Sequence, residues 1–355
     1  MLRARTELLK TIADMRIWIP YIDGGSGSDR STLEVADGFR RAGDEIVLQR
    51  FARNYQFAPW LLRRVPAPRG SSIVLTNNWN GFAFARPGIC LVTVDRYFPN
   101  DHSLSKYKGL LQQLYHQHLI RRYIIASARC ADRVVAVSQY TAAAYAQALD
   151  LPKPLVILNA VDTEFYTPDV VGKPPLANRP FKLLFVGNLS MRKGADLLAP
   201  IMQRLGAGFE LTYTSGIRKS RLKQSAPNMI PLVTQNAERM RESYRQADML
   251  LFPSRGEGLS RALMESLACG TPVVAADASS NGEAVDDSVG ALCPVDDVDA
   301  FAAAIVRLSE RPQALRQMGR SARVRAIQRF ALTRLVTEYR QLFEELVACQ
   351  SHRLH

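Results

Sequence analysis

The sequence lacks any run of eighteen apolar residues, so we expect no helix that spans a membrane. Cysteine is scarce, and no two cysteines have paired spacing, which argues against a disulfide framework or a zinc site and fits a reducing compartment. The first ten residues carry charges on both sides of a very short apolar stretch, unlike a secretory signal. These absences predict a cytoplasmic protein.

No internal repeat of roughly 20 to 50 residues is visible, so a solenoid is not expected. No low-complexity tract is present either, and 47% of the residues are hydrophobic, which is typical of a folded globular protein. A chain of 355 residues is long enough for two domains with separate cores.

Acidic residues are fewer than basic ones, and the net charge is +13, spread over both halves of the chain. An excess of positive charge favours anionic partners such as nucleotide diphosphates, lipid headgroups or nucleic acid. No nucleic-acid-binding motif accompanies it, so we expect no nucleic acid partner.

Apolar runs alternate with helical spacing along the first half of the chain, which indicates a parallel α/β sheet. The predicted strands are 16–22, 46–48, 71–76, 89–94 and 133–138. Helices are predicted at 33–42 and 140–149. Residues 1–14 precede the first strand and form a predicted extension.

A stretch rich in proline and glycine, residues 172–180, is the predicted linker between two domains. A second alternating series follows it. Its predicted strands begin at 181, 209, 229, 249 and 273, and long helical patterns cover 298–308, 313–330 and 332–347. We therefore predict an N-terminal domain over 15–171 and a C-terminal domain over 181–331.

Glu257 and Glu265 stand eight positions apart around a predicted strand–loop–helix junction. A helix N-terminus attracts phosphate through free N–H groups, here those of Gly258, Leu259 and Ser260. Carboxylates nearby accept hydrogen bonds from sugar or ribose hydroxyls. The combination suits a nucleotide sugar, although a dipole-favoured Glu257 and a solvated Glu265 would produce the same spacing.

The small residues, proline and glycines around this acid pair resemble the E-x7-E signature of the family 4 glycosyltransferases. That resemblance implies a retaining enzyme with two Rossmann-like domains facing across a cleft, the GT-B fold. It implies that Glu257 contacts the donor sugar and that Glu265 holds the ribose. It further implies that the last helix, 332–355, packs back on the N-terminal domain.

A glycine turn and a basic pair follow the strand at 181–186. Gly187, Asn188, Arg192 and Lys193 make a diphosphate clamp plausible, in which Lys193 or Arg192 neutralises charge as the nucleotide leaves. The segment resembles the family's strand–Gly-Arg-Leu–Lys-Gly pattern, and Lys193 matches the family lysine. Asn188 stands where the family usually has arginine. No metal or other cofactor is implied, because the lysine and the helix end take that role and no Asp-x-Asp motif is present.

The first turn of the N-terminal domain contains Gly24, Gly25 and Gly27. Its spacing is not G-x-G-x-x-G, which argues against a nicotinamide dehydrogenase. The resemblance places this turn beside the sugar–phosphate site, with Gly27 as the nearest match, although a simple βα turn fits equally. Where the family often has a histidine near the sugar, this chain has Asp95, and His102 follows in the next loop.

Residues 106–125 mix apolar and basic side chains at helical spacing. This pattern is typical of a domain helix with its apolar face in the core, which we favour. It is also typical of a helix that lies on an anionic membrane and admits a lipid-linked acceptor. A peripheral position at the inner membrane face therefore stays open.

The predicted activity is retaining transfer of a hexose from a UDP- or GDP-linked donor to a glycan or lipid-linked acceptor, in cell-surface polysaccharide or glycolipid synthesis. Two alternatives remain. A sugar-nucleotide epimerase of the same fold would convert the donor alone. A non-enzymatic binder of anionic polymer or membrane would not respond to UDP or GDP.

Overall fold

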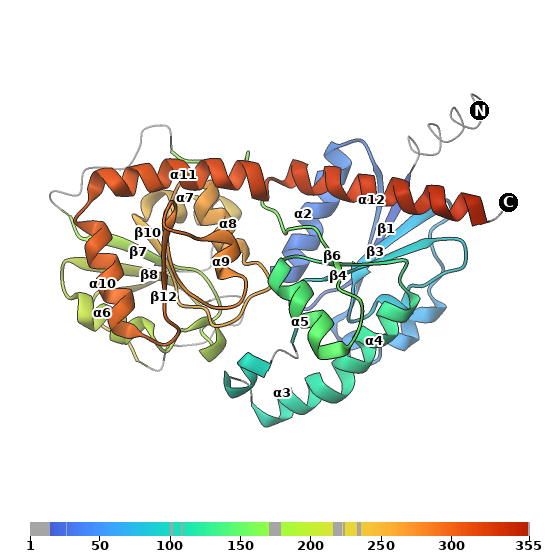
Figure 1. The fold of residues 1–355 in the computed structure, drawn as a ribbon, viewed down its shortest axis with the longest axis horizontal. Coiled ribbons are helices and arrows are strands. Elements are labelled where there is room, and N and C mark those ends of the chain that lie inside the picture. Colours follow the sequence, from blue (N-terminus) through green and yellow to red (C-terminus); the bar gives the residue numbers. More distant parts are fainter. Residues whose placement is uncertain are drawn as a thin grey trace. The chain divides into compact units, whose positions relative to one another are not determined.

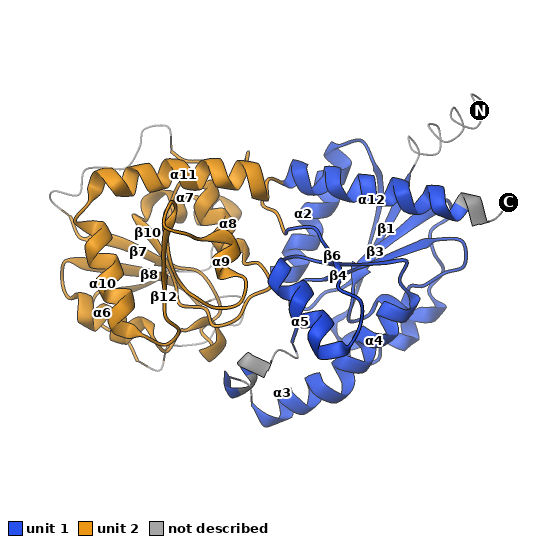
Figure 2. Cartoon of the chain, in the orientation of Figure 1, with its two compact units in different colours: residues 1–158, 332–355 blue, residues 159–331 orange. Residues whose placement is uncertain are grey.

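The chain folds into two compact units, residues 1–158 with 332–355 and residues 159–331 (Figure 2). The computed structural model describes residues 15–25, 27–99, 102–107, 109–169, 179–215, 222, 224–232 and 236–353. Each unit is built on a six-stranded parallel sheet. The predicted α/β class with two Rossmann-like domains is confirmed. The predicted extension 1–14 and residues 172–178 of the predicted linker lie outside the described residues.

In unit 1 the strand order is β2-β1-β3-β4-β5-β6 (Figure 1). The strands are β1 (Arg16–Ile22), β2 (Glu45–Phe51), β3 (Ser71–Asn77), β4 (Cys90–Asp95), β5 (Arg133–Ala136) and β6 (Leu155–Val156). The helices are α2 (Gly27–Arg41), α3 (Leu110–Leu114), α4 (Arg121–Cys130), α5 (Gln139–Leu149) and α12 (Leu332–Arg353). A π-helical segment, Tyr115–Ile120, joins α3 to α4. β2 pairs with one edge of β1 and β3 with the other, so the strand order reverses between β1 and β3.

Helix α12 packs on α2 of unit 1, as the resemblance implied. The ring of Phe39 in α2 stacks on Phe343 of α12 with centroids 5.8 Å apart, and Tyr339 meets it edge-on. Gly38 allows this close approach, because a Cβ at that position would lie 3.0 Å from side-chain atoms of Leu332 and Val336. Unit 1 is therefore assembled from two distant stretches of the chain.

The division between the units falls at Leu158, before the predicted boundary at 171. Residues just after this point bind unit 2 instead. The side-chain amide of Asn159 donates to the carbonyl of Leu259, and the Arg323 guanidinium donates to the carbonyls of Thr163 and Tyr166. Tertiary hydrogen bonds of this kind leave no trace in local composition.

In unit 2 the strand order is β12-β11-β10-β7-β8-β9. The strands are β7 (Phe181–Phe185), β8 (Phe209–Thr214), β9 (Met229–Leu232), β10 (Met249–Phe252), β11 (Val273–Ala276) and β12 (Gly290–Cys293). The helices are α6 (Leu198–Leu205), α7 (Ala237–Gln246), α8 (Arg261–Ala268), α9 (Asn281–Ala284), α10 (Val298–Ser309) and α11 (Pro312–Phe330). Here the strand order reverses between β7 and β10.

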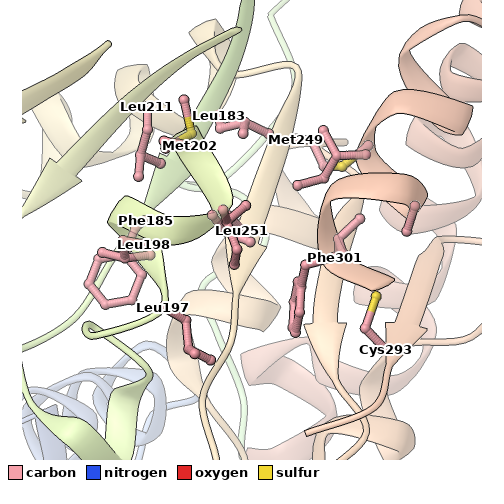
Figure 3. Close-up of a cluster of buried hydrophobic side chains, with 14 of the residues drawn as sticks. Leu183, Phe185, Leu197, Leu198, Met202, Leu211, Met249, Leu251, Cys293 and Phe301 are labelled. Atoms are coloured by element: carbon pink, nitrogen blue, oxygen red, sulfur yellow. The ribbon is translucent and has the colours of Figure 1, made fainter. Parts of the chain in front are cut away.

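The core of unit 2 lies where α6 and α10 cover one face of the sheet. Figure 3 shows Leu198 and Met202 of α6 beside Leu183 and Phe185 of β7. Alternate residues of β10, including Phe252, are buried on the opposite face. Strands buried on both faces appear in sequence as continuous apolar runs, which is why β7 and β10 could be predicted. The sheet holds the loops that follow β7 and β10.

Candidate functional site

Two loops of unit 2 meet where its strand order reverses. One follows β7 and carries Gly187, Asn188, Arg192 and Lys193, and the other follows β10 and carries Glu257. Ligands of open α/β sheets bind beyond the carboxyl ends of the strands at such a point. The topology therefore brings residues more than sixty positions apart into one candidate site.

The loop after β7 carries the basic pair in a short turn and not in a helix. Met191–Lys193 form one 3-10 turn, and α6 begins only at Leu198. Gly194 interrupts the helix, because its φ of +70° is left-handed. A Cβ on Gly194 would lie 2.2 Å from the carbonyl oxygen of Pro253. The glycine thus lets the two loops pack backbone against backbone.

Gly187 fixes the start of the same loop. Its N–H donates to Thr214 Oγ1 at 2.9 Å, and the Thr214 hydroxyl donates back to the Gly187 carbonyl at 3.2 Å. Further along, the N–H of Arg255 donates to the carbonyl of Arg192 at 2.9 Å. These bonds hold Arg192 and Lys193 against the loop after β10.

Lys193 and Glu257 form an ion pair at the centre of this site. Lys193 Nζ lies 2.6 Å from Glu257 Oε1, and the two side chains are only 14% and 10% exposed. Arg192 Nη1 lies 3.2 Å from the same oxygen, and the Ser254 hydroxyl also donates to it. Three donors therefore converge on one carboxylate oxygen.

Burial alone would raise the pKa of Glu257, but Lys193, Arg192 and Ser254 together lower this pKa below its ordinary value. Glu257 is therefore a carboxylate at neutral pH and accepts hydrogen bonds only. Burial lowers the pKa of Lys193 by more than Glu257 raises it. A buried lysine of this kind gains from any further anion that reaches it.

The main chain of Glu257 is also held, by the loop after β11. Its N–H donates to Ser279 Oγ at 2.9 Å, and the Ser280 hydroxyl donates to its carbonyl at 3.3 Å. Ser279 adopts a φ of +47°, which is uncommon for a residue with a side chain. Strain of this kind occurs where surrounding contacts fix a loop, often at functional sites.

Arg255 anchors the site from beneath, and the sequence predictions missed it. The buried guanidinium forms a two-pronged bond to Asp196 at 2.7 and 2.8 Å, and its Nε lies 2.5 Å from Asp296. It also donates to the carbonyl of Met191. Burial opposes the charge, yet the two carboxylates raise the pKa of Arg255 above its ordinary value. The usable indication was a basic residue placed three positions after the end of a buried strand.

Glu265 lies in α8 and is nearly fully buried. The Tyr244 hydroxyl donates to its Oε2 at 2.8 Å, and Arg261 Nη2 donates to its Oε1 at 2.7 Å. Burial and Glu265 raise the pKa of Tyr244 well above its ordinary value, so the hydroxyl keeps its proton. Glu265 is therefore a positioned carboxylate rather than a solvated one.

Helix α8, the helix of the predicted strand–loop–helix junction, begins at Arg261. Its N-cap, Ser260, has an extended backbone with φ −73° and ψ 129°. Within the described part of the chain, the N–H groups of Leu259 and Ser260 donate to no protein acceptor. Free amides at the mouth of a helix are suited to an anion.

Of the predicted site residues, the structure joins Glu257, Lys193 and Arg192 directly. Asn188, Gly187 and the segment Gly258–Ser260 lie in the same two loops. Gly27 is the first residue of α2 in unit 1, and a Cβ there would meet open space. Its predicted role beside the donor stays a prediction.

Asp95 ends β4 of unit 1 with its side chain fully buried. His102 begins a 3-10 segment, His102–Tyr107, and its side chain lies outside the described part of the structure. Whether either replaces the family histidine therefore stays open.

The described residues contain no group of three or more histidine, cysteine, aspartate or glutamate side chains that could hold a metal ion. Among the same residues, no helix is both long and apolar enough to cross a membrane.

Comparison with known proteins decides the family. Residues 26–165 match the family model described as Glycosyltransferase Family 4, and residues 180–311 match the one described as Glycosyl transferases group 1. The chain belongs to the family 4 glycosyltransferases. Lys193, Glu257 and Glu265 all lie in the part of the chain matched by the second model.

Two curated relatives show how far the likeness extends. The chain is 30% identical over 215 residues to a D-inositol 3-phosphate glycosyltransferase of Segniliparus rotundus, covering 54% of this chain and 47% of that protein. It is 28% identical to the lipopolysaccharide core mannosyltransferase LpsB of Rhizobium meliloti, covering 61% and 66%. The chain therefore spans less than two thirds of these relatives.

Solved structures with low identity share the fold of this chain. Sucrose-phosphate synthase from Thermosynechococcus elongatus matches with a TM-score of 0.77 and 17% identity, covering 94% of this chain and 100% of that one. The Anabaena protein Alr3699/HepE, in complex with UDP-glucose, matches with a TM-score of 0.67 and 18% identity, covering 94% and 99%. Identities this low support the GT-B fold alone.

Proposed function

We propose that this glycosyltransferase moves a hexose, with retention, from a UDP- or GDP-linked donor to a glycan or lipid-linked acceptor. The observation that carries the proposal is the buried Lys193–Glu257 pair beside the free amides of Leu259 and Ser260. A cation and amides suit the diphosphate, and the carboxylate suits the sugar hydroxyls.

Each residue has a defined role in this proposal. Lys193 and the amides of Leu259 and Ser260 bind the diphosphate and stabilise the charge that develops on it as the sugar leaves. Glu257 accepts hydrogen bonds from the sugar, and Glu265 accepts them from the ribose. Arg192 remains next to Glu257 and limits its freedom.

Donor binding requires an exchange of partners. Lys193 is bound to Glu257 in the structure, so the diphosphate must draw it away while the sugar hydroxyls replace it on the carboxylate. Glu265 makes a similar exchange, because Arg261 occupies one of its oxygens. Lys193 then pairs with the diphosphate and Glu257 keeps Arg192, so neither of these two buried charges is left alone.

Retention would follow from attack on the same face of the sugar that the phosphate leaves, with that phosphate taking the acceptor proton. The names of two relatives support the substrate classes: Alr3699/HepE is described with UDP-glucose, and LpsB is named for lipopolysaccharide core biosynthesis. We propose cell-surface polysaccharide or glycolipid synthesis as the pathway on this basis.

Variants of the two proposed donor contacts test the function. Lys193→Ala should lower the turnover number by about 100-fold or more, because a transition-state charge loses its partner. Glu265→Ala and the milder Glu265→Gln should weaken UDP or GDP binding by roughly tenfold or more. Product formation from labelled donor measures the turnover number of Lys193→Ala. Calorimetric titration measures the affinity of the Glu265 variants for UDP or GDP.

Exposed residues of the same types serve as controls. Lys153→Ala and Glu310→Ala lie outside the site and should match the wild type. Wild-type affinity in both Glu265 variants, together with wild-type turnover in Lys193→Ala, would refute these roles. Incubation with donor alone separates the alternatives, since an epimerase converts the donor without an acceptor.

A further inference from the structure

Unit 1 exposes several large apolar side chains on two neighbouring segments. We call Phe57, Trp60, Leu61, Leu110, Leu111 and Leu114 together the leucine–aromatic surface; all six are exposed. Leu110 and Leu111 are 73% and 83% exposed, far more than a leucine that supports a core. Contiguous exposed apolar side chains mark interaction sites more often than single ones do.

The two segments form one surface because they pack on each other. The ring of Phe57 lies 5.9 Å from that of Tyr115, and the ring of Trp60 lies 6.3 Å from that of Tyr123. The Tyr123 hydroxyl donates to the carbonyl of Phe57 at 3.1 Å. Leu111 and Tyr115 stand four residues apart on one helix, so they share a face.

The same helix also has a conventional buried face. Ile120, Tyr123 and Ile124 join the core of unit 1. The domain helix favoured from the sequence is therefore present over this part, and the leucines of α3 are additional to it. Because the leucines of α3 are exposed, they contribute little to the core of unit 1.

The charge around the leucine–aromatic surface has one sign. Residues 51–130 contain only two acids, Asp95, which is fully buried, and Asp101, which lies outside the described residues. The exposed basic residues of the two segments include Arg53, Arg63, Arg64, Lys106, Arg121 and Arg122. Apolar side chains bordered by cations suit an apolar layer beneath anionic headgroups.

We propose that the leucine–aromatic surface docks unit 1 on an anionic lipid bilayer. The leucines and Trp60 would enter the boundary between headgroups and acyl chains, while the arginines reach lipid phosphates. A second copy of this chain fits less well, because a two-fold contact would place the same arginines opposite each other. The proposal does not depend on transferase activity.

Vesicle flotation of the full chain tests the proposal without substrate. Wild-type protein should float with vesicles of phosphatidylcholine and phosphatidylglycerol, and less with phosphatidylcholine alone. Leu110→Ser with Leu111→Ser should lower the partition coefficient about tenfold or more, because the apolar surface of two leucines is no longer transferred from water to the bilayer. Arg121→Gln with Arg122→Gln should lower binding only to the anionic vesicles, and added salt should do the same.

Val324→Ser with Ile327→Ser is the matched control. These α11 residues of unit 2 are 50% and 47% exposed, and their substitution should leave flotation unchanged. Equal flotation of the leucine variant and the wild type, or no flotation of either, would overturn the proposal. A dimer that light scattering detects in the wild type and that the leucine substitutions convert to a monomer would also overturn the proposal. That result would assign the surface to a second copy of the chain.

Discussion

Asp95 places an acid inside unit 1, where a parallel sheet normally has apolar side chains. Its Oδ1 accepts a hydrogen bond from the N–H of Tyr97 at 3.2 Å, and its side chain is fully buried. Burial raises the pKa of Asp95 from 3.8 to about 7, against smaller opposing effects of the Tyr97 N–H and Asn78. The carboxyl group is therefore largely protonated below neutral pH in the folded protein.

This shift makes the stability of unit 1 depend on pH. In the unfolded chain Asp95 releases its proton near pH 4, whereas in the folded chain it does so near pH 7. Unfolding between these values releases a proton, so the free energy of unfolding should fall as pH rises across this window. The slope contributed by one group is at most about 1.4 kcal/mol per pH unit.

Denaturant unfolding across this pH range measures the effect, and Asp95→Asn should remove this part of the slope. Asp37→Asn changes an exposed acid of the same unit and should leave the slope unchanged. A slope that is the same in the wild type and in Asp95→Asn would show that Asp95 is ionised throughout.

The partners of Glu265 show what could be predicted at the scale of residues. Arg261 stands four positions before Glu265, and that spacing on a helix is sufficient to predict the ion pair. Tyr244 comes from α7, and no local pattern brings it to Glu265. Likewise, the sequence placed Lys193 and Glu257 in one site but did not indicate that they bind each other.

Gly194 controls how closely the two site-bearing loops approach. Gly194→Ala should destabilise unit 2 through a left-handed φ and a clash with the Pro253 carbonyl, together costing more than about 1 kcal/mol. The substitution should also weaken donor binding, because Lys193 directly precedes Gly194 and would move with it. Denaturant unfolding and nucleotide titration measure the two effects.

Gly88→Ala separates the cost of a left-handed φ from the cost of the clash with the Pro253 carbonyl. Gly88 has a similar φ of +75°, but a Cβ there would meet open space. It should therefore show only the conformational cost. If both variants lose the same stability and bind donor normally, close packing of the two loops is not what requires Gly194.

Elements with a continuous apolar pattern were predicted well, and those without one were not. β1 was predicted at its observed bounds, and β7 and β10 were recognised from apolar runs. The 3-10 segments at Arg53–Gln56 and Pro59–Arg64 were missed, since so short a helix has no period to detect. The second of these segments carries Trp60 and Leu61 of the leucine–aromatic surface, and Phe57 directly follows the first.

At the scale of the whole molecule, the last helix stabilises the unit that also contains the first strand. Phe343 of α12 is fully buried against Phe39 of α2. Phe343→Ala should lower the stability of unit 1 by about 3–5 kcal/mol, as expected for removing a core aromatic ring. Hydrogen exchange should then show loss of protection in α2 and β1, with α6 and β7 of unit 2 unchanged.

Gln341→Ala changes an exposed residue of the same helix and serves as the control. Equal loss of protection in both units after Phe343→Ala would mean that the two units unfold together. Selective loss in unit 1 would support α12 as part of its core.

Because unit 1 requires α12, its folding must wait until the ribosome has translated the end of that helix. Unit 2 is one unbroken stretch, residues 159–331, and can fold during synthesis. The earlier-translated β1–β6 segment would meanwhile leave Phe39 of α2 uncovered. A truncated polypeptide ending before Leu332 should therefore be a preferred client of chaperones.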